Sequence, residues 1–212
     1  MISSIIDIFG QRSSFFIELI IEHTIICSIA ILFVMIIGVS LGILMTRVKI
    51  LEALVLPISG IIYTIPSIAL FGILVSITGI GNKSAIIALI VYGLLPMIRN
   101  VYVGIKQVDQ DVVEASRAMG AKSHEILFYV ELPLALPVIF AGFRTMVVMT
   151  IALGAIAAFI GAGGLGVAIY RGITTYNMEM VLSGSFIVAI LAMLIDLLLG
   201  KIEKRLIVKY SA

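Results

Sequence analysis

The sequence predicts an all-α bundle of about five membrane-spanning helices, and three observations lead to that prediction. Hydrophobic residues make up 62% of the 212 residues, whereas charged residues make up only 12%. An ordinary soluble domain carries about 25% charged residues, so this chain has too little polar surface to cover a water-soluble fold. Uncharged stretches that are long enough to cross about 30 Å of hydrocarbon recur along the chain, separated by short charged segments.

The predicted spans are 24–45, 53–77, 84–98, 143–160 and 180–199. The second contains Pro57 and Pro66, which interrupt it. The third is short, because only fifteen uncharged residues lie between Lys83 and Arg99. We expect it to borrow residues from Gly79 onwards, or to let Arg99 extend towards the interface.

The basic residues predict how these spans are oriented. Placing the loop at about 106–133 in the cytoplasm puts eleven Lys and Arg residues inside and three outside, in agreement with the positive-inside rule. The N-terminus is therefore expected outside the cell and the C-terminus in the cytoplasm. The expected segments are an extracytoplasmic or interfacial part at 1–22, a membrane domain at 23–200 and a cytoplasmic tail at 201–212.

The composition also argues against several other classes of protein. The basic residues lie between apolar runs rather than along one face, so the net charge of +2 does not indicate nucleic-acid binding. The single Cys27 cannot form an internal disulfide. The chain starts without a basic region or a small-residue cleavage pattern, so we expect no signal peptide.

The segment at 111–133 carries acidic and basic residues between two apolar spans, and it reads as two short helices. Asp111 and Glu114 would form an acidic first turn, with Asp in place of the usual Ser or Thr of a capping box. Gly120 suits a left-handed C-terminal cap. Ser123 is placed to start a second helix, and Pro133 is expected to end it.

One face of the first short helix is small and mildly apolar. It contains Val112, Ala115, Ser116 and Met119, at the spacing i, i+3, i+4 and i+7. Such a face suits insertion into a groove on another protein. The alternative is an amphipathic helix that rests on the bilayer surface.

The spacing of this segment favours the first interpretation. Glu114-Ala115-Ser116 is followed after three residues by Gly120, and after nine more by Val130-Glu131-Leu132-Pro133. This pattern resembles the EAA loop of the permeases of ABC-transporter importers, E-A-A, three residues, G, nine residues, I-x-L-P. The chain departs from it by having Ser116 in place of Ala and Val130 in place of Ile.

The resemblance implies that residues 111–121 form a coupling helix, which docks into a cleft of a separate ATP-hydrolysing subunit. The residues that it implies for this coupling are Asp111, Val112, Glu114, Ala115, Ser116, Met119, Gly120, Ala121, Leu132 and Pro133.

Two further segments, YTIPSIALFG at 63–72 and FIGAGGLGVAIYRGI at 159–173, are similar to osmoprotectant permeases. This resemblance implies a type I ABC importer permease fold in a bacterial cell membrane, and import of glycine betaine, carnitine or choline. It also implies three kinds of partner: two ATP-hydrolysing subunits, a second permease chain (identical or related) and an extracytoplasmic substrate-binding protein. Methionine-importer permeases share the architecture and are the nearest alternative.

The sequence offers no ATP site of its own, so ATP is expected to bind the partner and this chain is expected to be neither an enzyme nor a cofactor protein. Gly81-Asn82-Lys83-Ser84 lacks the Gly-Lys-Ser core of a phosphate loop. The stretch at 161–166 matches G-x-G-x-x-G but follows a membrane helix and lacks the acid that a dinucleotide site needs. We interpret it as a flexible re-entry in which glycines permit a tight reversal.

Three further polar residues lie outside these motifs. His23 and His124 have no metal-ligand partner at helical spacing. Asp196 is an acid embedded in a span, and such acids are candidates for function. Because it lies about one turn before Lys201, we favour interfacial capping or ion pairing.

The expected translocation path includes Tyr63, Thr64, Pro66, Ser67 and Gly154. Tyr63 could attract a quaternary ammonium through its ring, although an interfacial anchor is the preferred interpretation. Helix packing is the alternative for the whole set, as it is for Gly38 and Gly42 in the first span. The chain has no Trp, so tight recognition of a choline-like cation is expected in the separate binding protein.

Two other classes of protein remain open. A carrier driven by an ion gradient usually has internal repeats and charges at the midplane, and the sequence has neither. A membrane scaffold that recruits a soluble protein would share the loop but would not transport.

Overall fold

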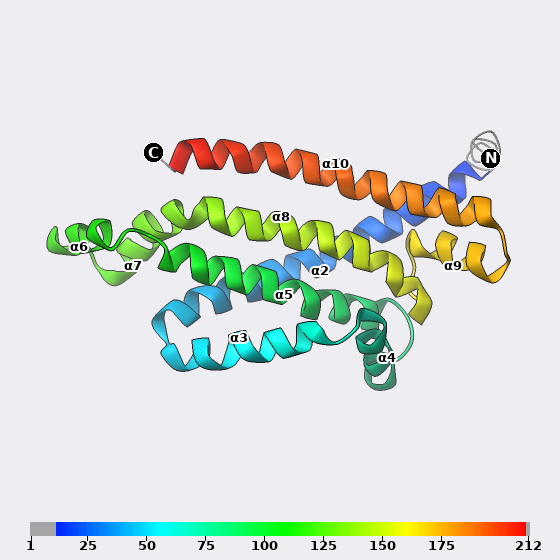
Figure 1. Ribbon diagram of the computed structural model, residues 1–212, viewed down its shortest axis with the longest axis horizontal. Helices are drawn as coiled ribbons and strands as arrows, with labels where there is room; N and C mark the ends of the chain where they lie inside the picture. Colours follow the sequence, from blue (N-terminus) through cyan, green and yellow to red (C-terminus); the bar gives the residue numbers. More distant parts are fainter. Residues whose placement is uncertain (1–11, 211–212) are drawn as a thin grey trace.

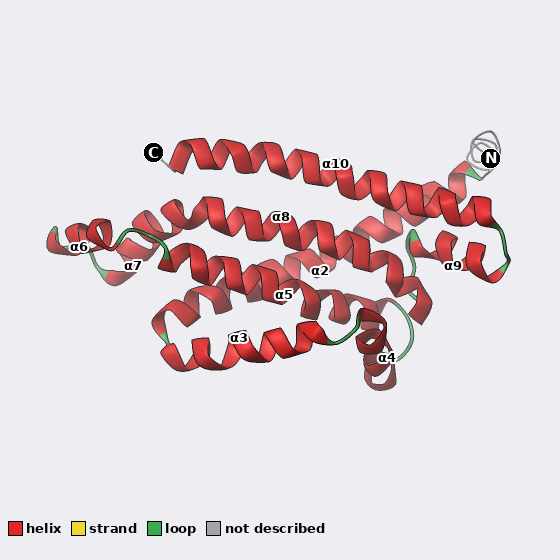
Figure 2. Ribbon diagram, viewed as in Figure 1, coloured by secondary structure: helices red, strands yellow, loops and turns green. Residues whose placement is uncertain are grey.

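The structure is a bundle of long helices (Figures 1 and 2), seen here in a computed structural model that describes residues 12–210. No β-strand occurs in this range. The helices in chain order are α2 (Ser13–Arg47), α3 (Lys49–Thr64), α4 (Ser67–Thr78), α5 (Asn82–Lys106), α6 (Gln110–Ala118), α7 (Ser123–Ile126), α8 (Leu132–Ile156), α9 (Gly166–Thr174) and α10 (Met178–Tyr210), with a π turn η1 (Leu127–Glu131) and a 3-10 turn η2 (Ala157–Ile160).

The long helices α2, α5, α8 and α10 extend along the bundle, and the loop elements gather at its two ends (Figure 1). The C-terminus and α6 lie at one end, whereas α9 and the start of α2 lie at the other. Within the described part of the chain, four helices are long and apolar enough to cross a membrane, or five crossings result if the bent pair α3–α4 counts as one. The predicted all-α bundle of about five spans is confirmed.

The helices are longer than the predicted spans. Helix α2 already begins at Ser13, and α10 continues to Tyr210, so the backbone has no break near residues 22 or 200. The division into an outer segment, a membrane domain and a tail therefore stays a prediction about depth in the bilayer. Residues 1–11 and 211–212 of that division lie outside the described residues.

The second and third spans differ from their predicted form. Pro66 breaks the second one sharply, because α3 and α4 meet at an angle of 101°. The proline lacks the N–H that would continue the helix and biases Ile65 towards an extended backbone, with ψ at 127°. The third span is longer than the predicted 84–98 at both ends: it starts at Asn82 and continues past Arg99 to Lys106.

Small residues allow α2 and α5 to pack closely. A methyl group built on Gly38 would lie 2.8 Å from Cγ of Met97, and one on Gly42 would lie 2.6 Å from Cβ of Val101. Both distances are below van der Waals contact, so only glycine fits at these positions without movement. The prediction that Gly38 and Gly42 form a close-packing face is confirmed.

The interface of α2 with α8 buries two polar side chains that both find backbone partners. His23 donates from Nε2 to the carbonyl of Ile151 at 3.1 Å, and the Cys27 thiol donates to the carbonyl of Thr150 at 3.7 Å. His23 is thus a satisfied core residue. No group of three or more metal-ligating side chains occurs between residues 12 and 210.

The glycine-rich stretch after α8 reverses the chain, as predicted. Gly161 and Gly164 take positive φ angles of 75° and 88°, which other residues adopt only with strain. Two side chains restrain the turn: Asn82 accepts from the N–H of Gly163, and Glu22 accepts from the N–H of Gly164, both at 2.9 Å. Helix α9 then runs out to the end of the bundle, where α10 begins and returns along it (Figure 1).

Candidate functional site

Helix α6 stands beyond the end of the bundle (Figure 1), and its first turn is capped by a residue that the sequence analysis did not identify. The carboxylate of Asp109 accepts a hydrogen bond from the backbone N–H of Asp111 at 2.9 Å. The predicted cap formed by Asp111 and Glu114 is therefore wrong by two residues. Asp111 lies in the first turn, where its charge still suits the helix dipole.

The side of α6 that packs against the rest of the chain differs from the face that was predicted to contact a partner. Val113 and Ser116 are the buried residues of this helix, and Ser116 also donates to the carbonyl of Val112 at 2.8 Å. Val112 and Met119 are 41% and 82% exposed, and Ala115 is exposed as well. Three of the four predicted face residues thus point outward, where a partner could contact them, while Ser116 helps to hold the helix in place.

The C-terminal end of α6 closes as predicted at Gly120. This residue has φ at +90°, and its N–H donates to the carbonyl of Arg117 at 3.0 Å. The N–H of Ala121 donates to the carbonyl of Ser116 at 3.2 Å. These two bonds form a Schellman motif, which satisfies carbonyls that a helix end otherwise leaves free.

The second short helix, α7, begins at Ser123 as predicted, but Pro133 does not end it. The elements α7, η1, α8 and η2 form one continuous helix over Ser123–Ile160. The π turn at Leu127–Glu131 ends two residues before the proline, so its wider hydrogen-bonding pattern accommodates a residue that lacks an N–H. Pro133 then occupies the first turn of α8, where prolines are tolerated.

Glu131, which is not among the predicted site residues, ties this π turn to α2. Its carboxylate is nearly buried and accepts a charged hydrogen bond from Nη2 of Arg47, the last residue of α2. The loop motif had treated this position as variable. An acid between two apolar residues at the base of the loop was the available signal.

A cavity of about 330 Å³ separates α6 from the helix that follows it. Its lining residues are Ser116, Met119, Ala121, Glu125, Tyr129 and Val130. Met119 and Tyr129 are largely exposed at 82% and 79%, so the mouth of this cavity is apolar and open to a partner. Leu132 and Pro133 are not among its lining residues; they lie at the start of α8 and are half-buried.

Four of the five expected path residues lie together at the break between α3 and α4. Tyr63 and Thr64 end α3, and Pro66 and Ser67 begin α4. Tyr63 donates from its hydroxyl to the sulfur of Met149 on α8 at 3.2 Å, and its ring packs edge-on against Tyr92 at 5.9 Å. The hydroxyl of Tyr92 donates to the carbonyl of Ile65, which the broken helix leaves free.

Gly154 does not join them. It is buried on α8 against α2, where a methyl group would lie 3.0 Å from both Sγ of Cys27 and Cε1 of His23. For this residue the structure supports the alternative of helix packing.

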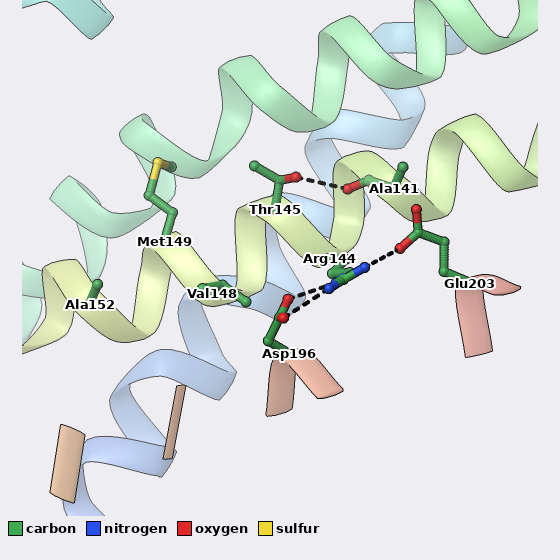
Figure 3. Close-up of a pocket in the computed structure, with 8 residues that line it drawn as sticks. All are labelled: Ala141, Arg144, Thr145, Val148, Met149, Ala152, Asp196 and Glu203. Carbon is green, nitrogen blue, oxygen red and sulfur yellow. Dashed lines mark hydrogen bonds and ion pairs between the residues drawn. The ribbon is translucent and has the colours of Figure 1, made fainter. Parts of the chain in front are cut away.

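A charged cluster lies on α8 and α10 beside a cavity of about 560 Å³ (Figure 3). Arg144 donates from Nε and Nη2 to the two oxygens of Asp196 at 2.6 and 2.8 Å. It also donates from Nη1 to Glu203 at 2.7 Å. The predicted ion pairing of Asp196 is confirmed, although its partner lies 52 residues away rather than at Lys201.

Comparison with known proteins identifies the family to which most of the chain is similar. The profile of the family described as "Binding-protein-dependent transport system inner membrane component" matches residues 35–208. The carnitine transport permease protein OpuCD of Listeria monocytogenes serotype 1/2a (strain 10403S) is 37% identical over 206 residues, covering 97% of this chain and 92% of that protein. The glycine betaine/carnitine/choline transport system permease protein OpuCD of Bacillus subtilis (strain 168) is 38% identical over 199 residues, covering 93% and 87%.

A solved structure has the same arrangement of helices. The inward-facing MetNI methionine ABC transporter contains a chain that matches with a TM-score of 0.79 at 25% identity. The match covers 92% of this chain and 98% of that one.

Proposed function

This chain belongs to the family of binding-protein-dependent transport system inner membrane components, and we propose that it carries quaternary-ammonium osmolytes such as glycine betaine, carnitine or choline into the cell. Its fold is that of type I ABC importer permeases. The proposal on substrate follows the two osmolyte permeases, which are more similar in sequence than the methionine transporter is.

The observation that carries the proposal is the placement of α6. This helix is capped at both ends, stands outside the bundle and exposes Val112, Ala115 and Met119. A short, rigid helix with small and flexible apolar side chains suits a groove on a soluble partner. We assign that groove to an ATP-hydrolysing subunit, which would bind the ATP.

The connections of α6 explain how the partner's movement would reach the membrane. The loop after α6 enters a helix that is continuous from Ser123 to Ile160, and Arg47 ties the same helix to the end of α2. A push on α6 would therefore move α8 and α2 together. ATP binding would favour one of two discrete packings of the bundle, and hydrolysis would release it.

The assembly that we propose contains this permease, a second permease chain, two ATP-hydrolysing subunits and an extracytoplasmic binding protein. A second chain is supported by α3, none of whose residues is buried within this chain. A helix that is apolar and uncovered requires either lipid or another protein. The binding protein would supply selectivity, and its need is stated in the description of the family.

The proposed orientation places the N-terminus outside and α6 with the C-terminus in the cytoplasm, in a bacterial plasma membrane. Position 12 and position 122 lie on exposed turns at opposite ends of the bundle. We expect a thiol reagent that cannot cross membranes to label a cysteine at 12 but not one at 122 in intact cells. Cys27 is buried, so background labelling is expected to be low.

Reconstitution tests the proposed function. The permease would be placed in vesicles with its ATP-hydrolysing and binding proteins, and uptake of glycine betaine, carnitine, choline and methionine would be measured with and without ATP. We expect ATP-dependent uptake of at least one quaternary-ammonium osmolyte. Uptake of methionine alone, or uptake that an ion gradient drives without ATP, would contradict the proposal.

A further inference from the structure

Arg99, on α5, differs from the arginines on α2 and α8. Arg47 is paired with Glu131, and Arg144 is held by two carboxylates. Arg99 is exposed on α5, and no carboxylate between residues 12 and 210 lies within ion-pairing distance of it. A guanidinium within a membrane-spanning helix is costly unless it reaches water or an anion, so this position is a candidate for function.

Arg99 lines a cavity of about 340 Å³ together with Tyr63, Leu95, Pro96 and Asn100. That volume lies within the range of about 300–1,000 Å³ for small-molecule sites. The lining combines one cation, one aromatic ring, one amide and two apolar side chains. Tyr63 is 43% exposed, so part of its ring remains accessible.

The surrounding contacts fix two of these groups in place. Tyr63 is held by its hydroxyl on the sulfur of Met149 and by the edge of Tyr92. Asn100 donates from Nδ2 to the carbonyl of Pro96 at 2.8 Å, and it packs against Gly142 of α8, where a methyl group would lie 2.3 Å from Cβ of Asn100. The ring and the amide therefore form a prearranged wall, while Arg99 has no ion-pair partner in the part of the chain that the structure describes.

The site lies towards the end of the bundle that carries α6. Arg99 is seventeen residues after Asn82 on α5, which corresponds to about 26 Å of helix. It is seven residues before Lys106, at the other end of this helix. A substrate that enters from the opposite end of the bundle would reach this cavity late in its passage.

We infer that the cavity of Tyr63, Arg99 and Asn100 binds the zwitterionic betaines, with Arg99 holding the carboxylate and Tyr63 facing the trimethylammonium group. This inference rests on the proposed function and adds a selective subsite within the permease itself. A guanidinium forms charge-assisted hydrogen bonds with a carboxylate, and a tyrosine ring attracts a quaternary ammonium. Choline has the ammonium but no carboxylate, so it uses Tyr63 alone.

A lipid phosphate is the other anion that Arg99 could reach, by extending towards the interface. The two sources of anion differ in one measurable respect. A lipid contact supports the fold of the permease and affects the transport of every substrate equally. A substrate contact affects carboxylated substrates and leaves choline unaffected.

The test compares Arg99→Gln, Tyr63→Leu and Tyr63→Phe in the reconstituted complex with saturating binding protein. The binding protein is the same in every sample, so a change in the ratio of maximal uptake rates for glycine betaine and choline belongs to the permease. Lys83→Gln is the matched control, because it removes an exposed cation from the other end of α5. The basal ATPase rate without osmolyte is measured alongside.

We expect Arg99→Gln to lower the ratio of glycine betaine to choline uptake by about tenfold, because the variant loses one charge-assisted hydrogen bond to the carboxylate. Tyr63→Leu should lower both uptake rates, and Tyr63→Phe should keep more of both rates than Tyr63→Leu because it retains the ring. The control Lys83→Gln should keep both the ratio and the basal ATPase rate. An equal fall for both substrates, or no change in the ratio, would overturn the subsite alone. A wild-type complex that carries neither substrate would instead overturn the proposed function, and the subsite with it.

Discussion

Arg47 and Glu131 join the end of α2 to the base of the loop that carries α6. The guanidinium of Arg47 donates to a carboxylate whose side chain is only 9% exposed, and the two residues are 84 positions apart in the chain. The contact falls on the π turn that leads into α8. It therefore links the projecting helix α6 to α2 and α8, two of the four long helices.

This pairing predicts a positive coupling between Arg47→Gln and Glu131→Gln. Each single change leaves one partner unmatched, whereas the double change removes both charges, so the double variant should be less destabilised than the sum of the two. We expect an interaction free energy of about 0.5–3 kcal/mol, towards the lower end because the Arg47 side chain is 42% exposed. Denaturation of the four proteins in detergent micelles measures it. Strictly additive effects would mean that the contact does not stabilise the protein.

The cap of α6 predicts different outcomes for two neighbouring acids. Asp109→Ala removes the side chain that accepts from the N–H of Asp111, and it should destabilise α6 by about 1 kcal/mol. Asp111→Ala removes a first-turn charge but no cap, so its effect should be smaller. Amide hydrogen exchange over residues 110–118 measures both. Faster exchange in Asp111→Ala than in Asp109→Ala would contradict this assignment.

Gly120 predicts a link between backbone conformation and coupling. Its φ of +90° disfavours any residue with a Cβ, although nothing lies within 4 Å of the added methyl group. Gly120→Ala should therefore cost about 1–2 kcal/mol through strain alone and lower uptake per ATP hydrolysed. Gly120→Asn should be milder, because Asn tolerates this conformation better.

The matched control for that experiment is Gly72→Ala on α4. Its methyl group also meets nothing within 4 Å, but the glycine has an ordinary helical backbone. We expect unchanged coupling in this variant. Uptake per ATP that stays at the wild-type level in Gly120→Ala would show that the closure of α6 is not needed for coupling.

The features that the sequence could predict are determined by residues that lie close together in the chain. Continuous apolar stretches predicted the spans, because each helix must satisfy its own backbone in lipid. Gly120 and Ser123 marked the end of α6 and the start of α7, since caps act within a few residues of the position that they define. Gly38 and Gly42 predicted a close contact, although not that Met97 and Val101 would fill it.

The features that the sequence did not predict are of two kinds. Some depend on residues that lie far apart in the chain, and others on a choice between neighbouring residues that suit the same position equally well. Asp109 and Asp111 are both acceptable caps by residue type, and only the backbone geometry selects Asp109. A proline such as Pro133 usually ends a helix, but here the π turn before it allows the helix to continue. The partners of Arg47 and Arg144 lie 84 and 52 residues away, beyond the reach of any spacing pattern.

The cluster on α8 and α10 predicts that Arg144 holds these helices together. Arg144→Gln leaves Asp196 and Glu203 without the cation that pairs with both of them, so the amount of assembled complex should fall. Asp196→Asn and Glu203→Gln each leave Arg144 one charged partner and should assemble better than Arg144→Gln. Size-exclusion chromatography in detergent measures assembly, and uptake per assembled complex separates folding from transport. If Asp196→Asn assembles at the wild-type level but transports nothing, then Asp196 acts on the substrate or on gating rather than on helix packing.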